Sequence, residues 1–205
     1  MARKIFALSL AVVILFMTGI GLTGCNVWES YEFSSLEELQ AALPDDFYFF
    51  EFENIDFSEN GEFFGMKKIQ SSIPKEDWQF NRYEIYFNTV NPDNGQEHRF
   101  EITATFHMYP RSFVGKIYEY RTIDDLFCKL NYNDKKNELL LTFGIGSGGV
   151  ERYFYYFIMS TSENILNEAE DTLNEKEVEY FLSICIPAIE SRYKINQTTQ
   201  QGENS

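Results

Sequence analysis

Two stretches of alternating polar and apolar residues decide the fold: FNRYEIYFNTV at residues 80–90 and HRFEITATFHMY at residues 98–109. The apolar positions are odd-numbered in the first stretch and even-numbered in the second, and they are Tyr83, Ile85, Phe87, Phe100, Ile102, Ala104, Phe106 and Met108. A period of two predicts strands with one buried and one solvent-facing side. Residues 91–97, which include Pro92 and Gly95, connect the stretches. We therefore predict a long antiparallel hairpin at the centre of the chain.

Shorter aromatic or apolar runs on both sides predict five more strands, at residues 47–52, 62–69, 113–120, 139–143 and 152–159. Asn60-Gly61 is a turn dipeptide, so the first two of these runs are expected to pair as a hairpin.

Three segments have helical spacing. Ser34 or Ser35, followed three residues later by Glu37 or Glu38, forms a capping-box pattern ahead of a short helix that ends before Pro44. A second short helix is expected at residues 122–130. A long helix is expected at residues 174–193, where apolar residues recur at helical intervals, namely Val178, Phe181, Leu182, Cys185, Ile186 and Ile189.

These elements predict an α+β fold, with a mainly antiparallel sheet of six or seven strands packed against the long C-terminal helix, and a short N-terminal helix. We expect a single domain at residues 34–195 and a frayed polar tail at residues 196–205. A curved sheet wrapped on a helix resembles the cystatin-like and NTF2-like folds, which carry no implication about function.

The composition excludes two classes of protein. With 20 Phe, 13 Tyr and 2 Trp, the chain of 205 residues has enough apolar surface to fold rather than remain disordered. Its net charge of −15 argues against a nucleic-acid partner, because binding to phosphates needs a basic face.

The first 25 residues have the order of a bacterial export signal. A basic start at Arg3-Lys4 precedes an apolar run from Ile5 to about Ile20, which is short for a membrane span. Leu22-Thr23-Gly24-Cys25 follows at once, and it resembles the lipobox of bacterial lipoproteins.

That resemblance implies cleavage by signal peptidase II between Gly24 and Cys25, and a diacylglyceryl group on the Cys25 thiol. Residues 1–24 would be the signal peptide and residues 25–33 the lipidated cysteine and a short tether. Two acyl chains hold a protein stably on a bilayer. We therefore expect a lipid-anchored protein on the extracytoplasmic face of the cell membrane, with a net charge of −17 once Arg3 and Lys4 are removed.

The glycine-rich stretch at residues 144–149 does not match a catalytic or phosphate-binding loop. No Lys lies between residues 137 and 175, and Ile145 stands where a serine nucleophile elbow needs Gly. A hairpin turn explains the glycines better.

Few residues could ligate a metal through nitrogen or sulfur. Apart from Cys25, these are His98, His107, Cys128 and Cys185, and the two histidines are nine residues apart on one expected strand, hence on opposite faces. We expect no metal and no cofactor, and we expect His107 to be a surface residue.

Cys128 and Cys185 could form a disulfide in an oxidising compartment. The expected helical geometry disfavours it, because Cys185 lies on an apolar stripe whereas Cys128 would point outward from the helix at 122–130. The favoured alternative is one buried thiol and one partly exposed thiol.

Carboxylates are abundant, but the adjacent pairs Glu37-Glu38, Asp45-Asp46 and Asp124-Asp125 are explained by helix capping and turns. The leading hypothesis is a membrane-anchored lipoprotein whose domain binds an envelope protein or a small ligand without catalysis. The alternative is a cell-envelope hydrolase that uses Asp or Glu side chains, which leave no linear motif.

Overall fold

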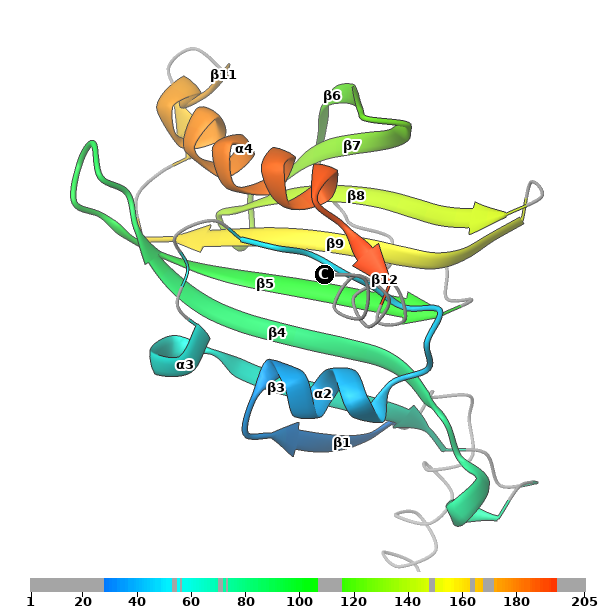
Figure 1. Cartoon of the computed structure of the whole chain (residues 1–205). Helices are drawn as coiled ribbons and strands as arrows, with labels where there is room; N and C mark the ends of the chain where they lie inside the picture. Colours follow the sequence, from blue (N-terminus) through cyan, green and yellow to red (C-terminus); the bar gives the residue numbers. More distant parts are fainter. Residues whose placement is uncertain are drawn as a thin grey trace, which may run out of the picture.

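The structure is a computed structural model that describes residues 28–52, 55, 57–69, 72, 74–106, 116–147, 150–162, 165–167 and 172–194. Its main feature is an eight-stranded sheet with the strand order β1-β3-β4-β5-β9-β8-β7-β6, in which every neighbouring pair is antiparallel. Figure 1 shows helix α4 lying across one face of this sheet and helix α2 beside β3.

The strands of the main sheet are β1 (Trp28–Phe33), β3 (Glu62–Lys68), β4 (Phe80–Val90), β5 (Glu97–Phe106), β6 (Lys116–Ile123), β7 (Leu126–Asn133), β8 (Glu138–Ser147) and β9 (Val150–Thr161). Two short strand pairs stand apart from it, β2 (Tyr48–Phe49) with β12 (Tyr193–Lys194), and β10 (Leu166–Asn167) with β11 (Thr172–Leu173). The helices are α2 (Leu36–Ala42), α3 (Phe57–Asn60) and α4 (Glu175–Glu190), with a 3-10 turn at Lys75–Asp77.

The predicted central hairpin is confirmed. Strand β4 has the expected bounds, and β4 pairs with β5 without a register shift from Arg82↔Thr105 to Val90↔Glu97. In the loop, the Gly95 backbone N–H donates to the Asn91 carbonyl at 2.8 Å, and Gly95 takes a φ of 73°, a conformation that glycine adopts without strain.

The predicted capping box of the N-terminal helix is also present, and α4 has a side-chain cap of its own. The Ser35 hydroxyl accepts a hydrogen bond from the Glu38 backbone N–H at 3.3 Å, and the Glu38 carboxylate accepts one from the Ser34 backbone N–H at 3.1 Å. Helix α4 begins after Asn174, whose side chain accepts from the Lys176 backbone N–H at 3.2 Å. Both helices therefore start where their sequences provide side-chain acceptors.

The predicted helix at residues 122–130 is wrong. These residues form the end of β6, a two-residue turn at Asp124-Asp125 and the start of β7, with Ile123 paired to Leu126. Asp124 takes a positive φ of 55°, which aspartate tolerates in turns. Leu126, Cys128, Leu130 and Tyr132 alternate inward, so the run fits a strand as well as a helix. The extra strands bring the sheet to eight rather than six or seven.

Two expectations near the N-terminus are also corrected. Residues 28–33, expected to belong to a tether, form the edge strand β1, which pairs with β3. Residues 47–52 do not pair with 62–69, because β2 pairs with β12, and β3 lies between β1 and β4. The helix α3 occupies the position where a hairpin turn at Asn60-Gly61 was expected.

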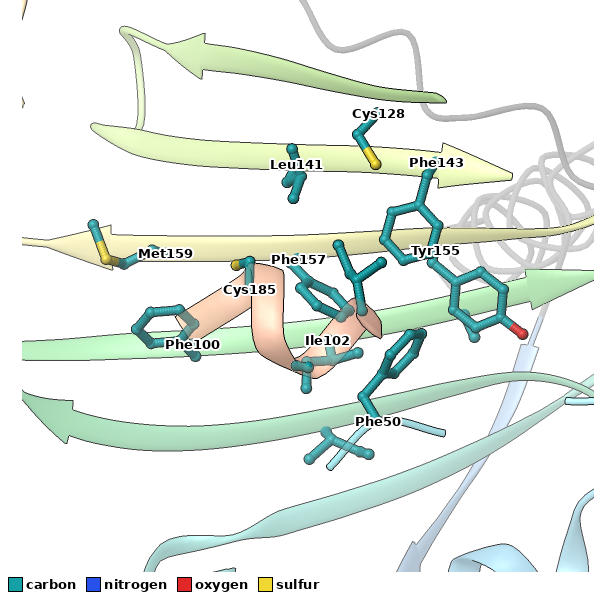
Figure 2. Close-up of a cluster of buried hydrophobic side chains, with 14 of the residues drawn as sticks. Phe50, Phe100, Ile102, Cys128, Leu141, Phe143, Tyr155, Phe157, Met159 and Cys185 are labelled. Carbon is teal, nitrogen blue, oxygen red and sulfur yellow. The ribbon is translucent and has the colours of Figure 1, made fainter. Parts of the chain in front are cut away.

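The core forms rows of apolar side chains that cross the sheet at matched register. One row crosses six strands and consists of Phe63, Ile85, Ile102, Phe157, Leu141 and Leu130. These residues belong to the same buried cluster as Phe181 and Cys185 of α4. Figure 2 shows part of this cluster, with Cys185 beside Phe157 and Ile102. The expected packing of the C-terminal helix on the apolar face is confirmed.

The aromatic segment at residues 47–52 covers the same face beyond the end of α4. The Phe49 ring stacks on Tyr83 with centroids 5.0 Å apart, and the Phe50 ring meets Phe157 edge-on at 4.8 Å. The Tyr83 hydroxyl donates to the Tyr48 carbonyl at 2.7 Å. One half of this face of the sheet is thus covered by α4, and the other half is covered by residues 47–52, which we call the aromatic strap.

We expect Phe157→Ala to lower the free energy of unfolding by about 3–5 kcal/mol, because the side chain is 0% exposed at the centre of the six-strand row. Val90→Ala is the control, since Val90 is 61% exposed, and it should change the free energy by less than about 0.5 kcal/mol. Urea unfolding of both variants measures the difference. Equal effects of the two substitutions would contradict this core.

Candidate functional site

A cleft opens in the sheet where β7 separates from β8. The two strands pair from Asn133↔Glu138 to Lys129↔Thr142, and among the described residues the ladder then stops although both strands continue. Beyond that point, Leu126 and Phe127 of β7 form one wall, and residues 143–146 of β8 form the other. The cleft has a volume of about 640 Å³, within the range of small-molecule sites.

The cleft has an aromatic lining with cationic groups. Phe143 of β8, Tyr155 and Tyr156 of β9 and Lys129 of β7 are among its lining residues, and the three aromatic side chains are themselves largely buried. Figure 2 shows the Phe143 and Tyr155 rings side by side, and they are stacked with centroids 5.4 Å apart. Such a lining suits a ligand with an apolar or aromatic body and an anionic group.

Arg192 holds the rim of the cleft in place. Its guanidinium bonds to Asp124 at 2.8 Å and to the neighbouring Asp125, and it also donates to the Ile189 carbonyl at 3.0 Å. The residue follows the end of α4, so these contacts tie the helix to the turn between β6 and β7. Tyr48 completes the rim on the side of β2.

The cleft contains no catalytic constellation among its described lining residues. Its one carboxylate belongs to Asp125, which is bonded to Arg192, and no His or Cys lines it. The glycines at 144 and 146 lie in β8, within the expected hairpin of β8 with β9. Residues 148–149 of that glycine-rich stretch lie outside the described residues.

Apart from the cleft, a polar pair formed by His98 and Glu177 lies buried between the sheet and α4. The His98 ring Nε2 is 3.4 Å from the Glu177 carboxylate, and both side chains are nearly inaccessible to solvent. The Asn94 side-chain amide donates to the other Glu177 oxygen at 3.2 Å, and the Tyr180 ring centroid is 5.0 Å from that of His98. Neither ring nitrogen has a hydrogen-bond partner in the described part of the chain.

Burial lowers the pKa of His98, and the nearby Glu177 carboxylate opposes part of that shift. His98 is therefore neutral near pH 7. Because the pair is sealed from solvent and does not line the cleft, we assign it a structural role at the junction of β5 and α4.

Both described cysteines are free and buried. Cys128 is 0% exposed, so the expected outward-facing thiol is wrong, because the residue lies on an inward position of a strand. Burial raises the pKa of Cys128 to about 11 and raises that of Cys185 well above its usual value. Neither thiol is a reactive nucleophile. Figure 2 shows both in the core, unbridged.

Two carboxylates, those of Glu84 and Glu101, lie close to Tyr86 on the face of the sheet that points away from the core. Glu84 accepts a hydrogen bond from the Tyr86 hydroxyl at 2.8 Å and is paired with Arg82, while Glu101 accepts one from Thr103 at 2.7 Å. Burial, the bond to Glu84 and the charge of Glu101 raise the pKa of Tyr86. Neither carboxylate lines the cleft.

The remaining predicted site residues, Gly24, Cys25 and His107, lie outside the described residues. Within the described ranges, no group of three or more His, Cys, Asp or Glu side chains could hold a metal ion. Nor does any helix in that part of the chain have the length and apolar character to cross a membrane.

Sequence reasoning missed both the cleft and the buried pair. His98 occupies an even position in line with Phe100 and Ile102, and Glu177 lies four residues before Phe181, so each could have been placed on the core side. The cleft could not be found, because it depends on where two strands cease to pair.

Comparison with protein-family models, with curated proteins and with solved structures finds no match to this chain.

We expect stability to depend on His98 below pH 6.5. A histidine with an ordinary pKa near 6.5 takes up a proton in the unfolded chain, whereas the buried ring resists it, so the free energy of unfolding falls as the pH drops below that value. The slope is at most about 1.4 kcal/mol per pH unit. Above pH 6.5 both states are neutral and the effect vanishes.

Urea unfolding at pH 7.5 and 5.5 measures this dependence, with His98→Gln as the comparison. The lowered carboxyl pKa values of Glu29, Glu37 and Glu38 affect both proteins alike, so the difference between the parent and the variant isolates His98. The variant should lose less stability than the parent protein. Parallel losses in the two proteins would show that His98 does not resist protonation.

Proposed function

We propose that this chain is a lipoprotein anchored to the extracytoplasmic face of a bacterial membrane through Cys25, and that its domain binds a ligand in the β7–β8 cleft without catalysis. The observation that carries the binding role is the cleft itself, an aromatic site with Lys129 and Arg192 in a chain whose net charge is −15. The anchor is carried by the lipobox Leu22-Thr23-Gly24-Cys25.

The position of β1 supports the anchoring proposal. Removal of residues 1–24 would leave every described strand intact, because β1 begins at Trp28. Only Asn26 and Val27 separate Cys25 from that strand, so a lipid on Cys25 would hold the β1 edge within roughly 10 Å of the bilayer. The cleft lies near the other edge of the sheet, where it would remain open to the medium.

The charges around the cleft support an anionic ligand. Arg192 is neutralised by Asp124 and Asp125, whereas Lys129 has no ion-pair partner among the described residues. An ammonium group beside the Phe127 and Tyr156 rings can bind a carboxylate or sulfonate while the rings contact the apolar part of the ligand. Envelope peptides and small aromatic acids both have this chemistry.

The alternative of a carboxylate-dependent hydrolase finds less support. Glu84 and Glu101 are near enough to Tyr86 to affect its pKa, but both Glu84 oxygens are engaged, by Arg82 and by the Tyr86 hydroxyl. A glycosidase needs two carboxylates facing each other across a substrate cleft. The cleft described here has only the paired Asp125.

Cys25→Ser should abolish incorporation of labelled palmitate in a bacterial host and release the protein from the membrane fraction. The expected reason is that a serine hydroxyl does not accept the diacylglyceryl group that the resemblance assigns to the Cys25 thiol. Cys128→Ser is the control, because this cysteine is buried in the fold and should leave labelling intact. Persistent labelling of Cys25→Ser would refute the anchor.

An aromatic sulfonate dye tests the cleft. We expect anilinonaphthalene sulfonate to bind residues 26–205, and Lys129→Glu to weaken the affinity about fivefold or more, because an attractive charge becomes repulsive. Lys135→Glu makes the same charge change in the turn between β7 and β8, outside the cleft lining, and should leave binding unchanged. Fluorescence titration measures all three. Equal weakening in both variants would exclude a site at Lys129.

A further inference from the structure

The β6 edge of the sheet displays more apolar surface than its surroundings. Strand β6 is terminal in the strand order, so one side of its backbone has no neighbour among the described strands. Three of the five large apolar side chains that are exposed in the described residues lie on the β6–β7 hairpin, and they are Ile117, Tyr120 and Phe127. Tyr120 is 53% exposed and Phe127 is 60% exposed, and their rings stack with centroids 5.3 Å apart.

The charged side chains along this edge are placed so that they would complement those of a second copy of the strand. Glu119 and Arg121 flank Tyr120 and form an ion pair with each other at 2.8 Å. If two copies of β6 lie antiparallel with Tyr120 on the two-fold axis, then Glu119 of one copy faces Arg121 of the other, and the reverse holds as well. A shift that places Arg121 on the axis would instead set two guanidinium groups opposite each other.

We propose that the chain forms a symmetric dimer in which the β6 strands of two copies pair antiparallel about Tyr120. The two eight-stranded sheets then join into one continuous sheet. Two ionic pairs form across the axis, because the Glu119 and Arg121 side chains of each copy lie on the same face of the strand. The pairing closes after two copies, so it does not propagate into a fibre.

The aromatic side chains add to the same interface. Tyr120 pairs with Lys129 and stacks on Phe127, so both rings stand on the face of the hairpin that points away from Ile123 and the core. In the dimer the two Tyr120 rings are direct cross-strand neighbours, and the Phe127 rings extend the row on either side. Aromatic cross-strand pairs stabilise antiparallel sheets, which gives this register an apolar contribution beside the ionic one.

The opposite edge of the sheet does not fit a second copy. Strand β1 carries Glu29 and Glu32, and residues 26–66 contain eleven acidic residues and no Lys or Arg. Two β1 edges would therefore repel each other. Strand β6 is the edge with both signs of charge and with exposed rings, and edges that natural proteins keep unpaired usually lack such apolar surface.

The first test is charge reversal in the full-length chain, solubilised in a density-matched non-ionic detergent. Sedimentation equilibrium should show a dimer at micromolar concentration. Arg121→Glu should weaken dimerisation about tenfold or more, because both cross-axis pairs become acidic. The double variant Glu119→Arg with Arg121→Glu restores opposite charges and should recover the dimer. A monomeric parent chain, or an unchanged Arg121→Glu dimer, would overturn the proposal.

The second test fixes the register and does not depend on charge. Tyr120→Cys should form an intermolecular disulfide under mild oxidation, because residues on the axis have Cα atoms about 4.5–5.5 Å apart. Thr122→Cys is the matched control on the same face, and its two copies would lie about 14 Å apart along the strands, beyond disulfide reach. Cys128 and Cys185 are buried and should not crosslink. Crosslinking of Thr122→Cys without Tyr120→Cys would refute this register.

Discussion

The register between β4 and β5 determines which side chains the sheet can bury. Ile85 faces Ile102, and both point toward α4 and the aromatic strap at residues 47–52. A slip of one residue would turn every side chain of one strand to the opposite face and would bring Thr103 or Glu84 to the core side. Because β9 pairs with β5, β8 with β9 and β7 with β8, this register also determines which residues of those strands are buried, as far as Leu130 of β7. The position of α4, and hence of Arg192 at the cleft, depends on those buried residues.

The cleft and the dimer edge both arise where this regular pairing ends. The β7–β8 ladder stops at Lys129↔Thr142, and residues 143–146 of β8 then line one wall of the cleft. The same hairpin then turns outward and presents Tyr120 and Phe127. Lys129 belongs to both surfaces, since it lines the cleft and pairs with Tyr120 on β6. A ligand in the cleft would therefore lie close to the proposed dimer contact.

The sequence predicted those parts of the fold in which one period holds over many residues. The alternation at residues 80–90 continues for a whole strand, and the stripe from Val178 to Ile189 fits only a helix, so both were found. Residues 122–130 were misassigned because Ile123, Leu126, Phe127 and Leu130 satisfy helical spacing while Asp124-Asp125 gives no strong turn signal. Strand β1 was missed because its alternation spans only four residues, from Ser30 to Phe33.

The candidate site was less predictable than the fold for a physical reason. Tyr48, Lys129, Tyr155 and Arg192 come from four separate segments of the chain, and no local pattern records where such residues meet. The buried pair of His98 and Glu177 joins a strand to a helix almost eighty residues away, so periodicity could place each residue on the core side but could not identify its partner.

The strand register can be measured directly by cross-strand nuclear Overhauser effects between backbone protons of labelled protein. The fold requires contacts of Ile85 with Ile102, Ile102 with Phe157, Phe157 with Leu141 and Leu141 with Leu130. Contacts displaced by one residue along β4 or β5 would contradict it, because the buried face, the placement of α4 and the cleft all require that pairing.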